Sequence, residues 1–275
     1  RIDIIHLGTT ERRHLTLPPD KSAGDTSPVF SPDGKKIAFK RNTGSGASDI
    51  YVVGTAGDQP QRITFDNKYI AALDWTEDGS AVIFASDRQG SRKLWRVPGS
   101  GGTPKLVDGA VRDPRYMSIA RRGNRLAYSY WFADTNIWRV DASKAFNPQA
   151  AEALISSTRA ETSAQYSPDG TRIAFRSDQS GPTEIWVSDA NGRNPRRLTS
   201  FNGPLTGSPR WSPDGRYLAF DSRPEGTSNI YVIPSGGGQL KRMTAGRGDN
   251  VVPSWSRDGK WIYFASNRSG AWQVW

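Results

Sequence analysis

Several residue types and motifs that carry chemistry are scarce or missing. The 275 residues include no cysteine, two histidines and two methionines. The absence of cysteine excludes disulfide bonds and thiolate metal sites, but it does not identify a compartment. No apolar run approaches the ~18 residues of a membrane-spanning helix, so we expect no transmembrane segment. No signal-peptide pattern opens the chain.

The motifs of common enzyme classes are missing as well. There is no Gly-x-Ser-x-Gly elbow of a hydrolase, no Walker phosphate loop and no His-x-x-x-His pair. His6 alternates with Ile5 and Leu7, which indicates a solvent-facing strand position rather than a catalytic one. We therefore predict no catalytic residue, no metal site and no cofactor.

The dominant feature of the sequence is a repeat. A turn glycine recurs at intervals of 44 to 47 residues, at Gly34, Gly79, Gly123, Gly170, Gly215 and Gly259. Three positions after each glycine stands an aliphatic residue, and five positions after it stands an aromatic one, namely Phe39, Phe84, Tyr128, Phe175, Phe220 and Phe264. Strand-forming residues around Pro-Asp-Gly turns predict β-hairpins. A period near 40–45 residues is typical of propeller blades.

The repeat predicts an all-β protein. We expect a six-bladed β-propeller of four-stranded antiparallel blades, in a single domain spanning residues 1–275. Repeat three departs from the pattern, because Arg121-Arg122-Gly123-Asn124 replaces its Pro-Asp-Gly turn. Repeats one to six cover residues 27–64, 72–107, 114–155, 163–199, 208–244 and 252–275.

The two ends of the sequence indicate how the ring closes. Repeat six stops at Trp275 before any fourth strand, whereas Arg13 to Thr16 resembles a spare fourth strand. We expect residues 11–17 to pair with the C-terminal blade, which removes an exposed sheet edge. Residues 2–7 resemble a third strand, and we expect them to be an added outer or loosely held strand. The abrupt ends lead us to expect a domain cut from a longer chain.

Short motifs identify a family that the chain resembles. Ser31-Pro32-Asp33-Gly34, Ser167-Pro168-Asp169-Gly170 and Ser212-Pro213-Asp214-Gly215 each precede an Ile/Leu-Ala-Phe strand, and Ser86-Asp87-Arg88 and Ser266-Asn267-Arg268 open the following loop. These residues resemble the TolB-type six-bladed β-propeller family over nearly the whole chain. The resemblance implies a bacterial protein, periplasmic or otherwise extracytoplasmic. Similar repeats serve as binding proteins, sensor segments and gating propellers of peptidases. TolB's separate N-terminal α/β domain has no counterpart here, so a Pal-type partner is not carried over.

The repeated side chains have structural roles. The aromatic residue five positions after each glycine is predicted to lie in the core. Burying it removes ~150–250 Å² from water, worth roughly 4–6 kcal/mol before entropy. The aspartate before the glycine, as in Asp33 and Asp214, is predicted to cap the turn by accepting hydrogen bonds from backbone amides. Each aspartate stands alone, which disfavours a calcium site.

The charge of the chain indicates its partners. Lysine and arginine number 37 against 27 acidic residues, a net charge of +10. A basic surface favours an acidic partner, which could be a protein or peptide, nucleic acid or an anionic envelope surface, and a merely soluble basic protein is the alternative. The basic residues are scattered rather than massed, which disfavours nucleic acid. We expect a monomer.

One face of a propeller gathers the loops between strands two and three and the loops that lead into strand one. Repeat three places Tyr130-Trp131-Phe132 there, and three adjacent aromatic residues cannot all point inward from a strand end. The predicted partner-binding residues on this face are Arg41, Arg88, Trp131, Asp178, Arg223 and Arg268. The alternative for Trp131 is that it covers the neighbouring blade.

We predict a non-catalytic binding, scaffold or sensor module that acts through this loop face. Two alternatives stay open at this point. One is the regulatory propeller of a peptidase-like enzyme, and the other is a propeller hydrolase or lyase with a site in the axial channel. The sequence names neither the ligand nor any attached domain.

Overall fold

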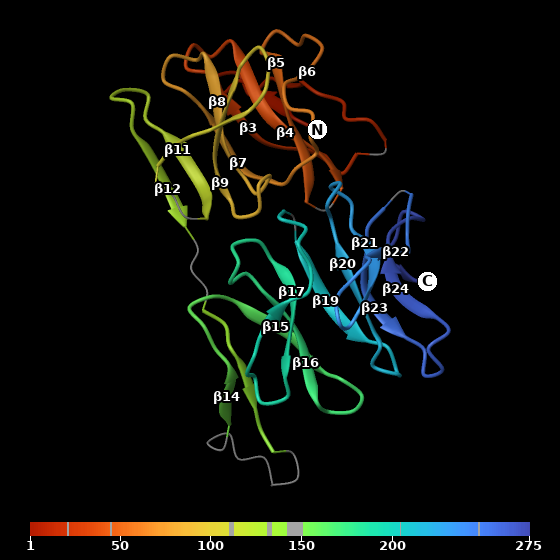
Figure 1. The fold of residues 1–275 in the computed structure, drawn as a ribbon. Coiled ribbons are helices and arrows are strands. Elements are labelled where there is room, and N and C mark those ends of the chain that lie inside the picture. The colour runs from red at the N-terminus through yellow and green to blue at the C-terminus, as the bar shows by residue number, and fades with distance from the viewer. Residues whose placement is uncertain are drawn as a thin grey trace. The chain divides into compact units, whose positions relative to one another are not determined.

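The computed structural model describes residues 1–20, 22–44, 46–109, 113–130, 134–141, 151–203, 205–246 and 248–275. It consists of two compact units, residues 1–132 and 133–275, and each is described by itself (Figure 1). The regular structure of the described residues is entirely β, which confirms the predicted class. Within those residues, no helix has the length and hydropathy needed to span a membrane.

The first unit contains a hairpin, two four-stranded sheets and a two-stranded sheet. The hairpin pairs β1 (Asp3–Ile5) with β2 (Arg12–His14). Repeat one forms β3 (Gly24–Phe30), β4 (Lys36–Gly44), β5 (Ala47–Gly54) and β6 (Gln61–Arg62). Repeat two forms β7 (Ile70–Trp75), β8 (Ala81–Ser86), β9 (Lys93–Pro98) and β10 (Lys105–Leu106). The first half of repeat three forms β11 (Pro114–Ile119) and β12 (Leu126–Tyr130).

The second unit begins with the other half of repeat three. That half forms β13 (Ile137–Arg139) and β14 (Glu152–Ile155). Repeat four forms β15 (Glu161–Tyr166), β16 (Arg172–Ser177), β17 (Glu184–Asp189) and β18 (Arg196–Arg197). Repeat five forms β19 (Thr206–Trp211), β20 (Tyr217–Ser222), β21 (Asn229–Pro234) and β22 (Lys241–Arg242). Repeat six forms β23 (Asn250–Trp255), β24 (Ile262–Ser266) and β25 (Gln273–Val274).

Each full repeat is a meander in which neighbouring strands pair antiparallel in chain order, as predicted. In repeats one, two, four, five and six the first strand begins two or three residues before the expected start, and a β-bulge lies inside it. The residue seven positions before the turn glycine takes a left-handed conformation in four repeats, at Ser27, Ser163, Ser208 and Val252. A bulge of this kind bends the strand and redirects its side chains.

The core lies between adjacent sheets. Ile50 and Ile63 of repeat one, for example, pack in one cluster with Phe84 and Trp95 of repeat two. The predicted core residues Phe39, Phe84, Phe175 and Phe220 have an exposed fraction of 0%. Phe264 is partly exposed because it lines an open groove between repeats five and six. Tyr128 of the divergent repeat three is 39% exposed.

The turns confirm the predicted role of the aspartates. Asp33 Oδ1 accepts hydrogen bonds from the Ser31 hydroxyl at 2.6 Å and from the Lys35 N–H at 3.1 Å. The hydrogen bond from Ser31 is the main reason why the pKa of Asp33 lies below its ordinary value. An Asp-Gly turn of the tight hairpin type would have both residues left-handed, but here only Gly34 is, with φ +71°. Its N–H donates to the Ser31 carbonyl, so proline and aspartate are the central residues of the turn.

The N-terminal hairpin repeats the geometry of a third and fourth strand. The Ile2 N–H donates to Thr16 Oγ1 at 2.9 Å. The equivalent bonds in repeats one, four and five, also 2.9 Å long, join Ile50 to Thr64, Ile185 to Thr199 and Ile230 to Thr244. Ile2 and Leu15 are buried against Phe39 of repeat one, whereas Ile5 and Leu7 are 53% and 90% exposed. The blade number, the ring closure and the single domain stay predictions.

Candidate binding face

In several repeats, hydrogen bonds or ion pairs join the loop between strands two and three to the loop that leads into strand one. Asp178, after the second strand of repeat four, accepts a hydrogen bond from the Ala160 N–H at 2.9 Å. Asn267 accepts one from the Asp249 N–H at 2.7 Å in repeat six. In repeat two, Arg88 Nη1 lies 3.4 Å from Asp66 Oδ2. We call the loops between strands two and three, the loops that enter strand one and the ends of the second strands beside them the loop edge.

Three of the predicted binding arginines lie over aromatic rings at the loop edge. The guanidinium of Arg41 lies 4.5 Å from the ring centre of Tyr51 and 5.6 Å from that of Phe39. Its Nε and Nη2 donate to the two carboxylate oxygens of Asp25 at 2.7 and 2.8 Å. The side chain of Arg41 is 12% exposed and that of Asp25 is 0% exposed. Such a buried, bidentate pair primarily holds the sheet together.

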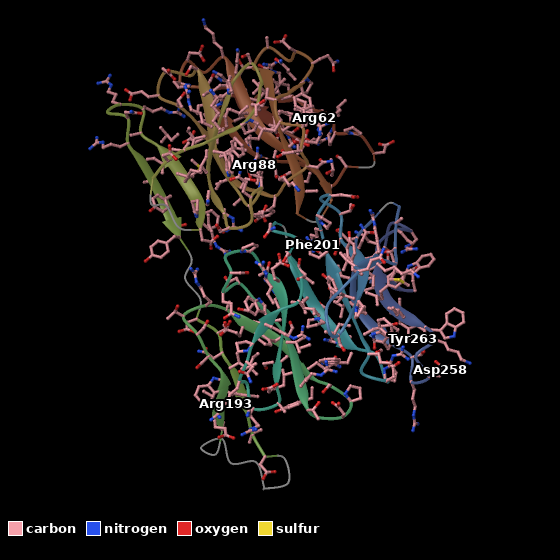
Figure 2. All side chains as sticks on the ribbon, in the orientation of Figure 1. Arg62, Arg88, Arg193, Phe201, Asp258 and Tyr263 are labelled. Atoms are coloured by element: carbon pink, nitrogen blue, oxygen red, sulfur yellow. The ribbon has the colours of Figure 1, made fainter. Side chains whose placement is uncertain are left out.

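Arg88 and Arg268 repeat this stacking. Arg88, labelled in Figure 2, lies 4.6 Å from the Phe84 ring centre and 5.1 Å from that of Trp95. Its side chain is only 6% exposed. Arg268 lies 5.0 Å from both Phe264 and Trp275, and it is exposed. Cation–π contacts of this kind stabilise the loop edge, and of the three arginines Arg268 is the most accessible to a partner.

A second group of charges surrounds Asp87. Burial raises the pKa of the Asp87 carboxyl from 3.8 to about 6, although the charges of Arg92, Lys68 and Arg88 oppose the shift. Asp87 Oδ1, Arg88 Nη2 and Arg92 Nε are buried without a hydrogen-bond partner. Arg92 also donates through Nη1 to Asp113 at 2.7 Å. Strongly shifted groups among unsatisfied polar atoms are typical of functional sites.

In the second unit, the predicted binding residues Asp178 and Arg223 lie near Arg176 and Asp221. The sequence analysis did not single out the latter two. Burial lowers the pKa of Arg176, whereas the carboxylates of Asp221 and Asp178 act to raise it and Arg223 to lower it. Burial raises the pKa of Asp221, which is 6% exposed. Asp178 and Arg223 therefore belong to one group of interacting charges with Arg176 and Asp221.

The surroundings of Arg176 leave its guanidinium available. Within the described residues, no hydrogen bond or ion pair engages it. The neighbouring strand presents Gly207, where a Cβ atom would lie 3.4 Å from Arg176 Cδ and 4.0 Å from Nη1. Asp221 Oδ1 accepts a hydrogen bond from the Val252 N–H at 3.2 Å. Val252 has φ +53°, an outlier for a β-branched residue of the kind that clusters at functional sites.

Aromatic residues are exposed in repeat three. Tyr130 is 64% exposed and Tyr116 of the neighbouring strand is 77% exposed. Exposed aromatic residues are frequent anchors of protein interfaces. The predicted binding residue Trp131 lies outside the described residues.

The chain matches two family models and curated relatives. The model of the TolB beta propeller domain matches residues 151–275, and that of the tricorn protease N-terminal beta propeller domain matches residues 7–142. Both models describe β-propeller domains, and the similarity to TolB extends over residues 151–275. The Tol-Pal system protein TolB of Anaeromyxobacter dehalogenans (strain 2CP-C) is 30% identical over 157 residues. The match covers 57% of this chain and 25% of that relative, so it spans about a quarter of the relative's length.

Solved structures of TolB proteins are also similar to this TolB-like propeller. The putative TolB from Agrobacterium tumefaciens is 20% identical, with a TM-score of 0.37, over 98% of this chain and 78% of that chain. TolB from Acinetobacter baumannii is 20% identical, with a TM-score of 0.38, over 94% of this chain and 51% of that chain.

Aligning the repeats shows what distinguishes Arg176 and Asp221 in the sequence. Arg176 and Asp221 both stand six positions after the turn glycine, where repeats two and six have Ala85 and Ala265. Repeat one has Lys40 at this position and repeat three has Ser129, so the aligned position varies among the repeats and is charged in three of them. Within the described residues, no group of three or more histidine, aspartate or glutamate side chains is arranged to hold a metal ion.

Proposed function

We propose that this TolB-like propeller is a non-catalytic binding module whose loop edge takes an acidic group of a protein or peptide partner. The observation that carries the proposal is the partly buried Arg176 guanidinium, which has no hydrogen-bond or ion-pair partner within the described residues and faces the bare backbone of Gly207. A guanidinium binds a carboxylate through two parallel hydrogen bonds. Burial strengthens such a pair because water screens it less.

The charge around Arg176 supports an anionic ligand. Arg223 lies close enough to lower the pKa of Arg176, so two cations act on the same region. The net charge of +10 would attract an acidic partner over a longer range. The carboxylates of Asp178 and Asp221 limit how much negative charge the ligand can carry, because they repel it. They therefore favour one well-placed carboxylate over a dense run of acids.

The other predicted binding residues divide into two roles in this proposal. Arg223 and Arg268 contact the partner together with Asp178, and Trp131, outside the described residues, stays a predicted contact. Arg41 and Arg88, whose side chains are 12% and 6% exposed, position the loops. The module works as a monomer, without a cofactor. The periplasmic or otherwise extracytoplasmic location that the family resemblance implies is part of the same proposal.

Capture of a labelled peptide that carries a single glutamate tests the acidic-partner proposal. We expect binding that weakens with salt and falls at least about tenfold in Arg176→Gln, because a hydrogen bond to a charged group contributes ~1.5–3 kcal/mol. Arg193→Gln is the matched control. Arg193, labelled in Figure 2, is an exposed arginine between the third and fourth strands of repeat four. Equal losses in the two variants would show that net charge, rather than this site, attracts the peptide.

A second candidate is the regulatory propeller of a peptidase-like enzyme. The match of residues 7–142 to the tricorn protease N-terminal propeller favours it. Capture from envelope and cytosolic extracts, beside a broad screen of hydrolase and lyase substrates, separates the two candidates. Recovery of a peptidase would favour the second. Turnover of any substrate by the chain itself, lost in Asp178→Asn, would contradict both non-catalytic proposals.

A further inference from the structure

The turns between strands one and two lie at the opposite ends of the strands from the loop edge. In the first unit we call three of them the turn row, which comprises residues 31–36, 76–81 and 120–125. The row is continuous. A Cβ atom on Gly79 would lie 3.4 Å from Cδ of Pro32, so the first two turns touch. Arg121 Nη2 donates to the Phe30 carbonyl at 3.3 Å, which joins the third turn to the start of the first.

The turn of repeat three lacks a capping acid of its own. Arg122 stands where repeat one has Asp33. The turn amides are bonded all the same, because the neighbouring repeat supplies a carboxylate. Gly123 and Asn124, with φ +85° and +47°, donate their N–H groups to the two carboxylate oxygens of Glu77 at 3.3 and 2.7 Å. Glu77 stands where repeats one, four and five have the turn proline.

This exchange places two arginines on the outside of the turn. Arg122 and Arg125 are exposed, and within the described residues neither side chain forms a hydrogen bond or an ion pair. A Cβ atom on Gly123 would lie 3.4 Å from Arg125 Nε, so the Arg125 side chain passes over the turn. An aspartate in place of Arg122 would cap the turn without help from another repeat, as Asp33 does. The stability of the turn therefore does not explain the arginine.

The rest of the turn row is basic as well. The row contains five basic and three acidic residues, namely Lys35, Lys36, Arg121, Arg122 and Arg125 against Asp33, Glu77 and Asp78. Hydroxyl and backbone N–H groups engage the acids. Asp78 Oδ1, for example, accepts hydrogen bonds from the Thr76 hydroxyl at 2.6 Å and from the Ser80 N–H at 3.0 Å. Within the described part of the chain, no ion pair joins an acid of the row to one of its basic residues.

We propose that the turn row binds a run of acidic side chains on a protein partner. The guanidinium groups of Arg122 and Arg125 can each pair with a carboxylate through two parallel hydrogen bonds. Asp33 and Asp78 are exposed and interrupt the row. The continuous phosphate chain of a nucleic acid would meet these acids, whereas a peptide can place its carboxylates between them. The charges of the row therefore favour an acidic protein segment over a nucleic acid.

This surface is independent of the carboxylate site proposed at Arg176. The turn row belongs to the first unit and to the other edge of its sheets. Around Arg176, the carboxylates of Asp178 and Asp221 repel a dense run of acids. Peptides that differ in their number of acidic residues therefore separate the two sites.

The experiment titrates a fluorescent hexaglutamate peptide with blocked ends with the full chain and follows its anisotropy at low ionic strength. We expect saturable binding that weakens as salt is added. Arg122→Gln/Arg125→Gln should weaken it by about fivefold to thirtyfold, because two exposed ion pairs of modest strength are lost. The same double variant should bind the single-glutamate peptide as the native chain does.

The matched control is Arg193→Gln/Arg257→Gln, which removes the same charge from two exposed arginines of the second unit. It should change the affinity for hexaglutamate by less than about twofold, because charges far from the peptide are screened.

Three results would overturn the proposal. One is the absence of saturable hexaglutamate binding by the native chain. Another is an equal loss in the two double variants, which would show that net charge attracts the peptide. The third is tighter binding of an oligothymidylate with six phosphates, or of phosphatidylcholine vesicles with a quarter of phosphatidylserine, that is lost in Arg122→Gln/Arg125→Gln. This last result would assign the row to a nucleic acid or to a membrane surface.

Discussion

Replacing Phe175 by alanine tests whether the repeated aromatic residues supply the core. Phe175 has an exposed fraction of 0% and packs with Ile155 and Ile173 in the second unit. Burial of ~150–250 Å² at ~25 cal/mol per Å² gives roughly 4–6 kcal/mol. That figure is an upper bound, because unfolded chains already bury part of their apolar surface. We therefore expect Phe175→Ala to lower the free energy of unfolding by ~3–5 kcal/mol.

The matched control is Phe264→Ala, which removes the aromatic side chain at the same repeat position where it is less buried. Phe264 also stands five positions after its turn glycine, but it is partly exposed along the groove between repeats five and six. Phe264→Ala should cost roughly 1–2 kcal/mol, within the range of ordinary substitutions. Urea unfolding, followed by tryptophan fluorescence and by circular dichroism, measures both variants. Coincidence of the two probes tests whether a single transition describes the unfolding.

The comparison separates burial from repeat position. If Phe264→Ala destabilised the chain as much as Phe175→Ala, burial would not determine the cost. If Phe175→Ala cost less than about 1 kcal/mol, the buried ring would not be the stabilising unit of the repeat.

Four further predictions concern other parts of the chain. Deleting residues 1–17 should lower the melting temperature sharply, because it removes a packed hairpin and the strand predicted to close the ring; an unchanged melting curve would contradict this. Trp131→Ala should cost little stability but weaken partner binding, unless it unfolds the chain as badly as Phe175→Ala. Asp87 has a pKa of about 6 in the folded chain, so its stabilising neutral form is present below pH ~4 and lost as the pH rises through about 6. The melting temperature of Asp87→Asn should therefore rise relative to the native chain over this interval, and parallel pH profiles would refute the assignment. Ser167→Ala should raise the pKa of Asp169 from about 2 towards 3.8 in an NMR titration, because the Ser167 hydroxyl is the main group that lowers it.

The sequence was sufficient to predict the sheets because each hairpin carries its own local signal. Turn glycines, capping aspartates and strand aromatics recur at fixed offsets, and the local turn chemistry determines each hairpin. The bulges were missed because Ser27 and Val252 are not residues that favour a left-handed conformation.

The binding residues were harder to predict because exposure depends on partners that lie far away in sequence. Arg41 was predicted to face a ligand, yet it is bonded to Asp25, 16 residues earlier. Arg88 lies against Asp66 of the preceding loop. Whether an arginine at the loop edge is engaged or available therefore depends on which acid the adjacent strand or loop supplies.

Variation among the repeats becomes interpretable once the fold pairs each position with its neighbour. Alignment alone shows that Gln179 stands where repeats two and six have a stacked arginine. Only the cross-strand register brings Glu161 opposite Ser177, as it brings Asp25 opposite Arg41. Repeats two and six have Ile70 and Asn250 at the position of that acid, so a stacked arginine does not require it.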